Sequence, residues 1–232
     1  MVSSDGGSDY KRGRGLGSDA MNTLISVSSG RRISAVAMEP ARMVDARPIS
    51  SFVDGESIYS SGERAGQAYR VEFGAVRVYR VLANGRRQIL AFHFGGSWFG
   101  LQNESQHRST AEAIGITGVK SINLQENPHA WQGLLPAVLE NFLSSQEHQL
   151  VIGRQSAVER VAAFLLEMSQ HSAHSHRFEL FMPRIDVADY LGLTIETVSR
   201  SLTKLKNKGI IKLHGARGIE IVEHGVLERL CL

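Results

Sequence analysis

The spacing of hydrophobic residues changes character along the chain, and the first pattern predicts strands. Between residues 50 and 125, short stretches of alternating apolar and polar side chains are separated by glycines. Alternation with a period of two predicts strands of about five to six residues, and glycine-spaced strands favour a small antiparallel barrel or sandwich. The Asn84-Gly85 pair is typical of a hairpin turn, because both residues tolerate a positive φ.

The second pattern, from residue 127 to 170, is helical. Apolar residues now recur three and four positions apart, which predicts a long amphipathic helix that starts at Asn127-Pro128 and breaks near Gly153. A second helix is expected over Ser156–Gln170. The apolar stripe of the first helix can pack on its own barrel or pair with a second copy of the chain, and the sequence favours neither. For pairing, the stripe residues are Leu135, Val138, Leu139, Phe142 and Leu150.

The third pattern predicts two helices joined by a short turn. They span Arg184–Leu191 and Ile195–Lys208, and the turn contains Gly192, which is the plan of a helix-turn-helix. Gly192 is expected in a left-handed conformation, and Thr194 is expected to cap the second helix. The residues expected to face inward are Ile185, Ala188, Leu191, Val198, Leu202 and Leu205.

Two short strands are expected after these helices, over residues 209–213 and 219–222, so that the whole segment predicts a winged helix. Its charge supports contact with DNA. The chain has 26 Lys and Arg against 23 Asp and Glu, a net charge of only +3. Between Glu196 and Arg217, however, six basic residues accompany a single acid, a net charge of +5. Basic residues are therefore concentrated where phosphates would lie.

Glu196 and Arg200 are the candidate base-contacting residues of the second helix. With Val198 facing inward, they lie four positions apart on the outer face. They could form only a surface ion pair, which contributes about 0.3 kcal/mol. In a major groove, arginine donates two hydrogen bonds to guanine and glutamate accepts one from cytosine. The second interpretation is favoured because turn, cap and local charge agree with it.

Composition excludes several classes of protein. The first 30 residues contain six glycines and seven serines, which predicts a disordered tail. No apolar run approaches a membrane span and no secretory signal is evident, so a cytoplasmic protein is expected. The single cysteine, Cys231, excludes a disulfide framework and an iron–sulfur cluster held by one chain, and no metal site is expected. No Walker loop, HExxH motif or nucleophile–base pair suggests an enzyme.

The segment Tyr190-Leu191-Gly192-Leu193-Thr194-x-Glu196-Thr197-Val198-Ser199-Arg200, followed by Gly209-Ile210-Ile211, resembles the DNA-binding domain of the CRP/FNR (catabolite-activator/fumarate-nitrate-reduction) regulators. The resemblance covers about residues 50–232 and is strongest to the FixK-type branch. It implies an α+β fold with an N-terminal double-stranded β-roll of the cyclic-nucleotide-binding kind, a long dimerisation helix and a C-terminal winged helix-turn-helix. The expected division is a tail at 1–30, the roll at 31–126, the dimerisation helix at 127–154 and the DNA-binding domain at 155–232.

The resemblance also implies a homodimeric activator that binds a palindrome of TTGA-type half-sites about one helical turn apart, in control of microaerobic, anaerobic or nitrogen-fixation genes. RNA polymerase would contact the loops Ala83–Arg87 and His171–Arg177. The residues implied or expected to contact bases are Ile195, Glu196, Thr197, Ser199 and Arg200. The residues implied or expected to contact phosphates are Arg184, Thr194, Lys204, Lys206, His214 and Gly215.

The sequence can also be searched for the residues that would bind an effector such as cyclic AMP or a haem. Arg108-Ser109 resembles the family's phosphate-binding pair, but Gly100 is followed by Leu101 where a cyclic-AMP pocket carries a glutamate for the ribose. These positions therefore resemble a vestigial pocket. His93 or His107 could be offered to a haem, although a lone histidine in a strand is more often a core residue. The favoured hypothesis is a regulator without cofactor, and the alternative is a regulator of the same fold that cyclic AMP or another small ligand controls.

Overall fold

The computed structural model describes residues 48–102, 104–126, 130–154, 156–172 and 176–231. The predicted tail and the helix start at Asn127-Pro128 lie outside these residues. In the described part of the chain, no helix is both long enough and apolar enough to cross a membrane.

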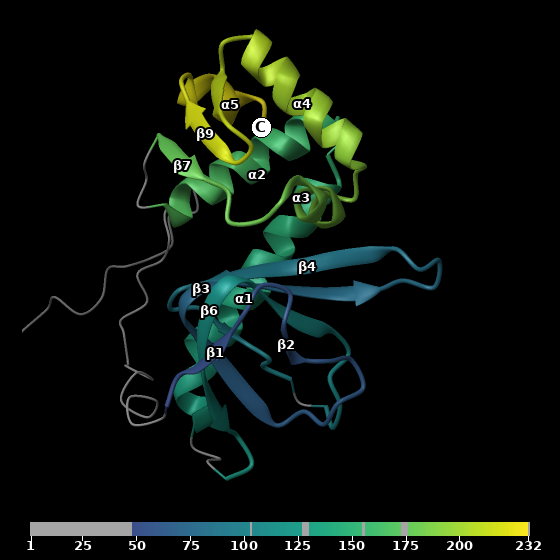
Figure 1. Ribbon diagram of the computed structural model, residues 1–232, viewed down its shortest axis with the longest axis vertical. Coiled ribbons are helices and arrows are strands. Elements are labelled where there is room, and N and C mark those ends of the chain that lie inside the picture. Colours follow the sequence, from purple (N-terminus) through teal and green to yellow (C-terminus); the bar gives the residue numbers. More distant parts are fainter. Residues whose placement is uncertain (1–47, 103, 127–129, 155, 173–175, 232) are drawn as a thin grey trace, which may run out of the picture. The chain divides into compact units, whose positions relative to one another are not determined.

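The N-terminal half is an antiparallel sheet rolled on itself, and it confirms the expected β-roll (Figure 1). Its main path runs β1-β6-β3-β4, while β2 pairs with β6 and β5 with β3. The strands are β1 (Ser50–Phe52), β2 (Ser57–Tyr59), β3 (Gln67–Val81), β4 (Arg87–Phe94), β5 (Trp98–Phe99) and β6 (Thr110–Asn123).

Two of these strands are much longer than the predicted five to six residues, since β3 has 15 residues and β6 has 14. The prediction was wrong because some glycines that suggested turns are bulges inside strands. Gly74 lies where the β3–β6 register shifts, with φ of +83°. A Cβ atom there would lie 2.6 Å from the carbonyl oxygen of Ile116. Only glycine lets the strand bend at this point and continue.

The hairpin at Asn84-Gly85 is confirmed, but its loop has three residues. The amide of Leu82 donates to the carbonyl of Arg86, and the amide of Gly85 donates to the carbonyl of Leu82, both at 2.8 Å. With Gly85 at φ of +78°, this is the pattern of a turn followed by a left-handed residue. The hairpin joins β3 to β4.

Two helices follow the roll: α1 (Ala130–Ile152) and α2 (Ala157–His171). Ser156 caps α2 by accepting a hydrogen bond from the amide of Glu159 at 3.2 Å. In α1, Ala130 and Leu134 are buried against the roll. Most of the apolar stripe of α1 instead faces outward, with exposed fractions of 66% at Leu135, 55% at Leu139, 56% at Phe142 and 71% at Leu150; Val138 is half-buried.

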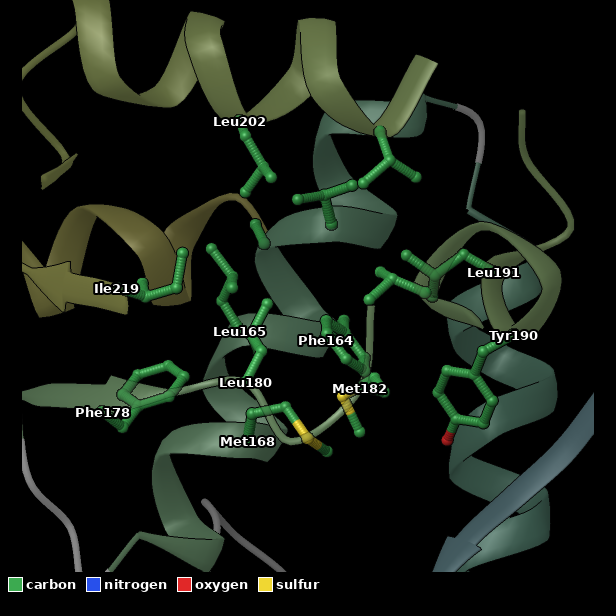
Figure 2. Packing of buried hydrophobic residues seen from close by; sticks show 14 of the residues in the cluster. Phe164, Leu165, Met168, Phe178, Leu180, Met182, Tyr190, Leu191, Leu202 and Ile219 are labelled. Carbon is green, nitrogen blue, oxygen red and sulfur yellow. The ribbon is translucent and has the colours of Figure 1, made fainter. Parts of the chain in front are cut away.

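The C-terminal part is a winged helix, as expected. Its sheet has the order β7-β9-β8, and β7 was not predicted because its three residues adjoin a loop. Figure 2 shows the core, where Phe164 and Leu165 of α2 lie among Leu191, Leu202 and Ile219. The elements are β7 (Arg177–Glu179), α3 (Arg184–Leu191), α4 (Ile195–Asn207), β8 (Ile211–His214), β9 (Gly218–Ile221) and α5 (His224–Arg229).

One inward residue of α3 was predicted wrongly. Ile185 is 45% exposed, and the residue that is fully buried is its neighbour Asp186. Two arginines of the roll, Arg77 and Arg87, form ion pairs with Asp186 and make burial of its charge tolerable. Hydrophobic periodicity does not contain this information, because the arginines lie about a hundred residues away in the chain.

Candidate DNA interface

The turn between α3 and α4 has the predicted geometry. Gly192 is left-handed, with φ of +64°. The hydroxyl of Thr194 accepts a hydrogen bond from the amide of Thr197 at 3.3 Å and so caps α4. Val198 is 1% exposed and Ala188 of α3 is also buried. The core contact at Val198 therefore sets which face of α4 points outward.

The outward face of α4 carries a stripe of four exposed polar residues. They are spaced three and four apart, which places them one above another on the helix, and they are Glu196, Arg200, Thr203 and Asn207. Thr203 and Asn207 were missed because they match no motif, although helical phase counted from Val198 would have found them. A hollow of about 480 Å³ on this helix is lined by Ser199, Arg200, Thr203, Lys204, Asn207 and Lys208.

The other predicted base-contacting residues are less exposed. Ile195 is 37% exposed at the start of α4, while Thr197 and Ser199 are half-buried. The hydroxyls of Thr197 and Thr194 lie 3.1 Å apart. Ser199 is 3.5 Å from Nη1 of Arg184, the first residue of α3, so this predicted phosphate contact lies beside α4.

The carboxylate of Glu196 is hydrogen-bonded within the start of α4. The pKa of Glu196 lies below its ordinary value, chiefly because the carboxylate accepts a hydrogen bond from its own backbone amide and another from Thr194. Among the described residues, Glu196 and Arg200 form no ion pair within 4.0 Å, although the charge of Arg200 also lowers the pKa of Glu196. Lys204 and Lys206 are both exposed.

Charge on the wing is more balanced than the sequence suggested. Nζ of Lys212 donates to Glu220 at 2.9 Å, and Nε2 of His214 lies 2.8 Å from the other carboxylate oxygen. These two contacts lower the pKa of Glu220. The net charge of +5 was counted only as far as Arg217, so it omitted the acid that neutralises part of the wing. Gly215 is exposed at the wing turn, with φ of +66°.

The residues of the expected vestigial pocket have different surroundings. Arg108 lines a hollow of about 700 Å³ on the roll, with 66% of its side chain exposed, and forms an ion pair with Glu104. Ser109 is buried at 3% exposure. Gly100 lies against Tyr69, whose ring would be 2.7 Å from a Cβ atom at that position. Arg108 and Ser109 therefore face different surroundings.

Aromatic side chains fill the interior of the roll around Ser109. Tyr59 stacks on His107 with ring centroids 3.7 Å apart, and it stacks on Phe99 at 6.2 Å. His93 stacks on Phe99 at 5.4 Å, and burial lowers its pKa to about 4, so it is neutral. Burial also raises the pKa of Tyr59 to about 12. Both histidines that could be offered to a haem are part of this packed aromatic group.

Comparison with known proteins agrees with the geometry. Residues 159–230 match the Crp-like helix-turn-helix domain, and residues 49–127 match the cyclic nucleotide-binding domain. The nitrogen fixation regulation protein FixK of Rhizobium meliloti (strain 1021) is 43% identical over 83% of this chain and 91% of that protein. FixK of Bradyrhizobium diazoefficiens is 35% identical over 77% of this chain and 80% of its own length.

The chain belongs to the CRP/FNR family of transcription regulators, in its FixK-type branch. The structure of FixK2 from Bradyrhizobium japonicum superposes on this regulator with a TM-score of 0.74 and 39% identity, over 80% of this chain and 97% of that one. A CRP-family transcriptional regulator from Thermus thermophilus, with a TM-score of 0.67 and 23% identity over 78% and 96% of the chains, supports the fold alone. The relatives are transcription regulators and not enzymes, and the helix-turn-helix is the DNA-binding part of this regulator.

Proposed function

We propose that this regulator is a homodimeric activator that binds a palindrome with TTGA-type half-sites without a bound cofactor and controls microaerobic, anaerobic or nitrogen-fixation genes. The observation that carries the proposal is the exposed stripe on α4, with Glu196 and Arg200 at its N-terminal end. Val198 and the Thr194 cap fix the orientation of this stripe. Because its target is chromosomal DNA, we expect the protein to act in the cytoplasm.

The chemistry of the stripe matches the proposed half-site. TTGA contains a single G·C pair, and Arg200 can donate two hydrogen bonds to O6 and N7 of its guanine. Glu196, which is ionised at neutral pH, can accept from N4 of a cytosine. The methyl groups of Ile195 and Thr197 suit contact with thymine methyls, and Ser199 is a further candidate for a base contact.

The backbone of the DNA would be held on both sides of this stripe. Phosphate contacts set the position of the protein on the duplex and carry no sequence information directly. Those proposed at the start of the helices come from Arg184 and the Thr194 cap, and those on the wing from His214 and Gly215. Lys204 and Lys206 supply the exposed cations of α4.

Dimerisation is supported by the outward apolar stripe of α1. Exposed leucines and a phenylalanine along one helix are costly in water unless another surface covers them, and a second copy of the same helix is complementary to them. The proposed contacts are Leu135, Val138, Leu139, Phe142 and Leu150. This assignment makes residues 127–154 the dimerisation segment, between the roll at 31–126 and the DNA-binding domain at 155–232.

The residues of the roll do not fit a cyclic nucleotide, although the domain belongs to the cyclic nucleotide-binding kind. A nucleotide phosphate needs a cation that faces the interior, whereas Arg108 is exposed and paired with Glu104. The ribose lacks a carboxylate because Leu101 stands at that position. Aromatic packing around Tyr59 and Phe99 occupies the interior. Nucleotide binding is therefore no part of the proposed function.

RNA polymerase is the proposed protein partner, through two loops. Residues 83–86 at the hairpin tip are exposed, whereas Arg87, which the expected contact loop included, is bound to α3 by ion pairs with Asp186 and Asp189. The contact at the hairpin is therefore assigned to residues 83–86. The second loop, His171–Arg177, includes residues 173–175, which lie outside the described part of the chain.

A binding assay on purified protein without added effector tests the proposal. Fluorescence anisotropy would compare a TTGA-N6-TCAA duplex with a scrambled duplex of equal length. Arg200→Ala should weaken specific binding by about 1–3 kcal/mol, or roughly 5- to 150-fold, and relax the preference for guanine at its position. The matched control, Lys206→Ala, should weaken binding to both duplexes alike and reduce the salt dependence. Absence of specific binding by the wild type, or equal losses on both duplexes for Arg200→Ala, contradicts the proposal.

Calorimetry separates this proposal from the effector-gated alternative. Cyclic AMP would be titrated into the wild type and into Arg108→Ala. We expect no heat of binding in either protein. Saturable binding that Arg108→Ala abolishes would establish the gated regulator instead.

A further inference from the structure

Helix α3 is attached to the β-roll by ion pairs that cross between two parts of the chain. Asp186 of α3 is fully buried, and its carboxylate accepts a hydrogen bond from Nη1 of Arg77 at 2.9 Å and another from Arg87. Nε of Arg87 also donates to Asp189 at 2.9 Å. Both arginines come from the β3–β4 hairpin and both aspartates from α3, so every one of these pairs joins the roll to the helix-turn-helix.

The roll presents these cations rigidly. Nε and Nη2 of Arg77 donate to Glu112 of the neighbouring strand β6 at 3.0 and 2.8 Å, and Glu112 also accepts from the hydroxyl of Tyr79. Gln88 adds a contact to the main chain of α3, since its Nε2 atom donates to the carbonyl of Asp189 at 2.8 Å. Contacts within the roll thus hold Arg77, and Gln88 adds a hydrogen bond between the hairpin and α3.

Fixing α3 also fixes α4. The two helices pack together through Ala188, Leu191 and Val198, all at most 1% exposed, across a turn that Gly192 and the Thr194 cap define. Tyr190, at the end of α3, packs on Phe92 of β4 with ring centroids 5.1 Å apart. The contacts of α3 therefore restrain the orientation of α4 relative to the roll, together with the apolar contact of Phe94 on β4 with Phe181.

An ion-pair junction restrains orientation more strictly than apolar packing does. A hydrophobic contact is non-directional, so it tolerates small rotations. A buried carboxylate must stay within hydrogen-bonding distance of its partners, because an unpaired buried charge is strongly unfavourable. Asp186 has two partners on separate strands, and few orientations of α3 satisfy both.

Orientation matters because two recognition helices must fit neighbouring half-sites, about 34 Å apart, at the same time. Any rotational freedom of a winged helix in the free dimer is lost on binding and reduces affinity. We propose that Arg77, Arg87, Asp186 and Asp189 form an ionic clamp that holds the winged helix in a DNA-ready orientation, and that the clamp does this without any ligand in the roll. The second part of the inference rests on the proposed function, since it assumes a dimer that binds DNA without an effector.

Single-molecule fluorescence energy transfer on the full chain tests the clamp directly. The native Cys231 would be replaced by serine. Dyes would then be attached to cysteines introduced at two exposed positions, by Ser51→Cys in the roll and Glu223→Cys in the winged helix. Labelled chains would be diluted with unlabelled chains so that each dimer carries a single dye pair. The variants are Asp186→Asn, which keeps the side-chain shape, and Arg87→Gln, which leaves Asp186 its bond to Arg77. The matched control is Glu72→Gln, which removes an ion pair with Arg70 inside strand β3.

We expect one narrow transfer population for the parent protein and for Glu72→Gln, and broad or multiple populations for Asp186→Asn and Arg87→Gln. The two clamp variants should also lose at least tenfold in affinity for the palindrome, and binding to DNA should narrow their populations again. If circular dichroism shows that Asp186→Asn does not fold, the transfer populations of Arg87→Gln test the clamp. Narrow populations in a folded clamp variant overturn the clamp. If the parent protein binds no palindrome yet shows the expected transfer changes, the proposed function fails and the orienting role of the clamp stands.

Discussion

Glu167 predicts a pH dependence of stability that can be measured apart from DNA binding. It lies on α2 and is half-buried, with both carboxylate oxygens 3.3–3.4 Å from the hydroxyl of Tyr190 in α3. His148 of α1 stacks on the same tyrosine ring at 3.8 Å. Burial raises the pKa of Glu167 from 4.5 to about 7, against the opposing effect of the tyrosine hydrogen bond. Its carboxyl group is therefore neutral in the folded protein at mildly acidic pH.

The sign follows from the order of the two pKa values. Between pH 4.5 and 7 the folded protein retains a proton that the unfolded chain releases, so stability falls as pH rises through this window. At about 1.4 kcal/mol for each pH unit, the raised pKa corresponds to a loss of at most roughly 3.5 kcal/mol, and the remaining contact with solvent reduces this to about 1–3 kcal/mol. Glu167→Gln keeps an acceptor for Tyr190 and removes the charge. The variant should match the wild type at pH 5 and exceed its stability by about 1–3 kcal/mol at pH 8.

Urea unfolding at one fixed protein concentration, at pH 5, 6, 7 and 8, measures this difference. Burial lowers the pKa of His148 to about 4. Below pH 6.5 the unfolded chain binds a proton at this histidine that the folded protein does not, so the stability of the fold decreases as pH falls. Comparison of variant and wild type at each pH cancels that contribution. Glu179→Gln, at an exposed position on β7, is the control and should show no trend with pH. A constant difference in stability between Glu167→Gln and the wild type at all four pH values would contradict the raised pKa of Glu167.

Three further predictions concern the DNA-binding machinery. Gly192→Ala places a side chain at φ of +64° with nothing within 4 Å of its Cβ, so we expect a loss of about 1–2 kcal/mol from backbone strain alone, seen in thermal unfolding. Phe142→Glu, at a 56% exposed position on α1, should yield monomers in sedimentation, whereas Ser144→Glu on the opposite side of the helix should stay dimeric; two dimeric variants would contradict the assignment. Glu220→Gln should release the two basic side chains that it binds on the wing and strengthen binding to all DNA sequences at low salt, and unchanged affinity would show that the wing lies away from phosphates.

The parts of the fold that the sequence predicted are those specified by neighbouring residues. Three features of the helix-turn-helix lie within seven positions of one another: the left-handed backbone at Gly192, the cap at Thr194 and the inward Val198. The structure has all three as expected. The hairpin at Asn84-Gly85 is local in the same sense. Because the hydrophobic phase of α4 follows from Val198, its outward stripe could also have been predicted completely, including Thr203.

The wrong predictions concern features that depend on contacts with residues distant in the chain. Asp186 is buried in place of Ile185 because arginines about a hundred positions earlier form ion pairs with it, and no local periodicity shows such a partner. Strand β3 continues through Gly74 because β6 leaves room for a bulge there but not for a side chain. On the wing, the phosphate-binding role expected for His214 was inferred without the acid at position 220 that binds its ring.

Under the proposed function, Lys204 and Lys206 of α4 are more available to phosphates than the basic side chains of the wing. Glu220 neutralises part of the basic charge of the wing, whereas in the described part of the chain Lys204 and Lys206 form no ion pair with an acid. Phosphate contacts supply affinity and base contacts supply selectivity. When both come from one helix, the orientation of that helix controls binding strength and sequence choice together. A fold that depends on orientation to this extent benefits from a directional attachment, which is what two arginines of the roll provide at the buried carboxylate of Asp186.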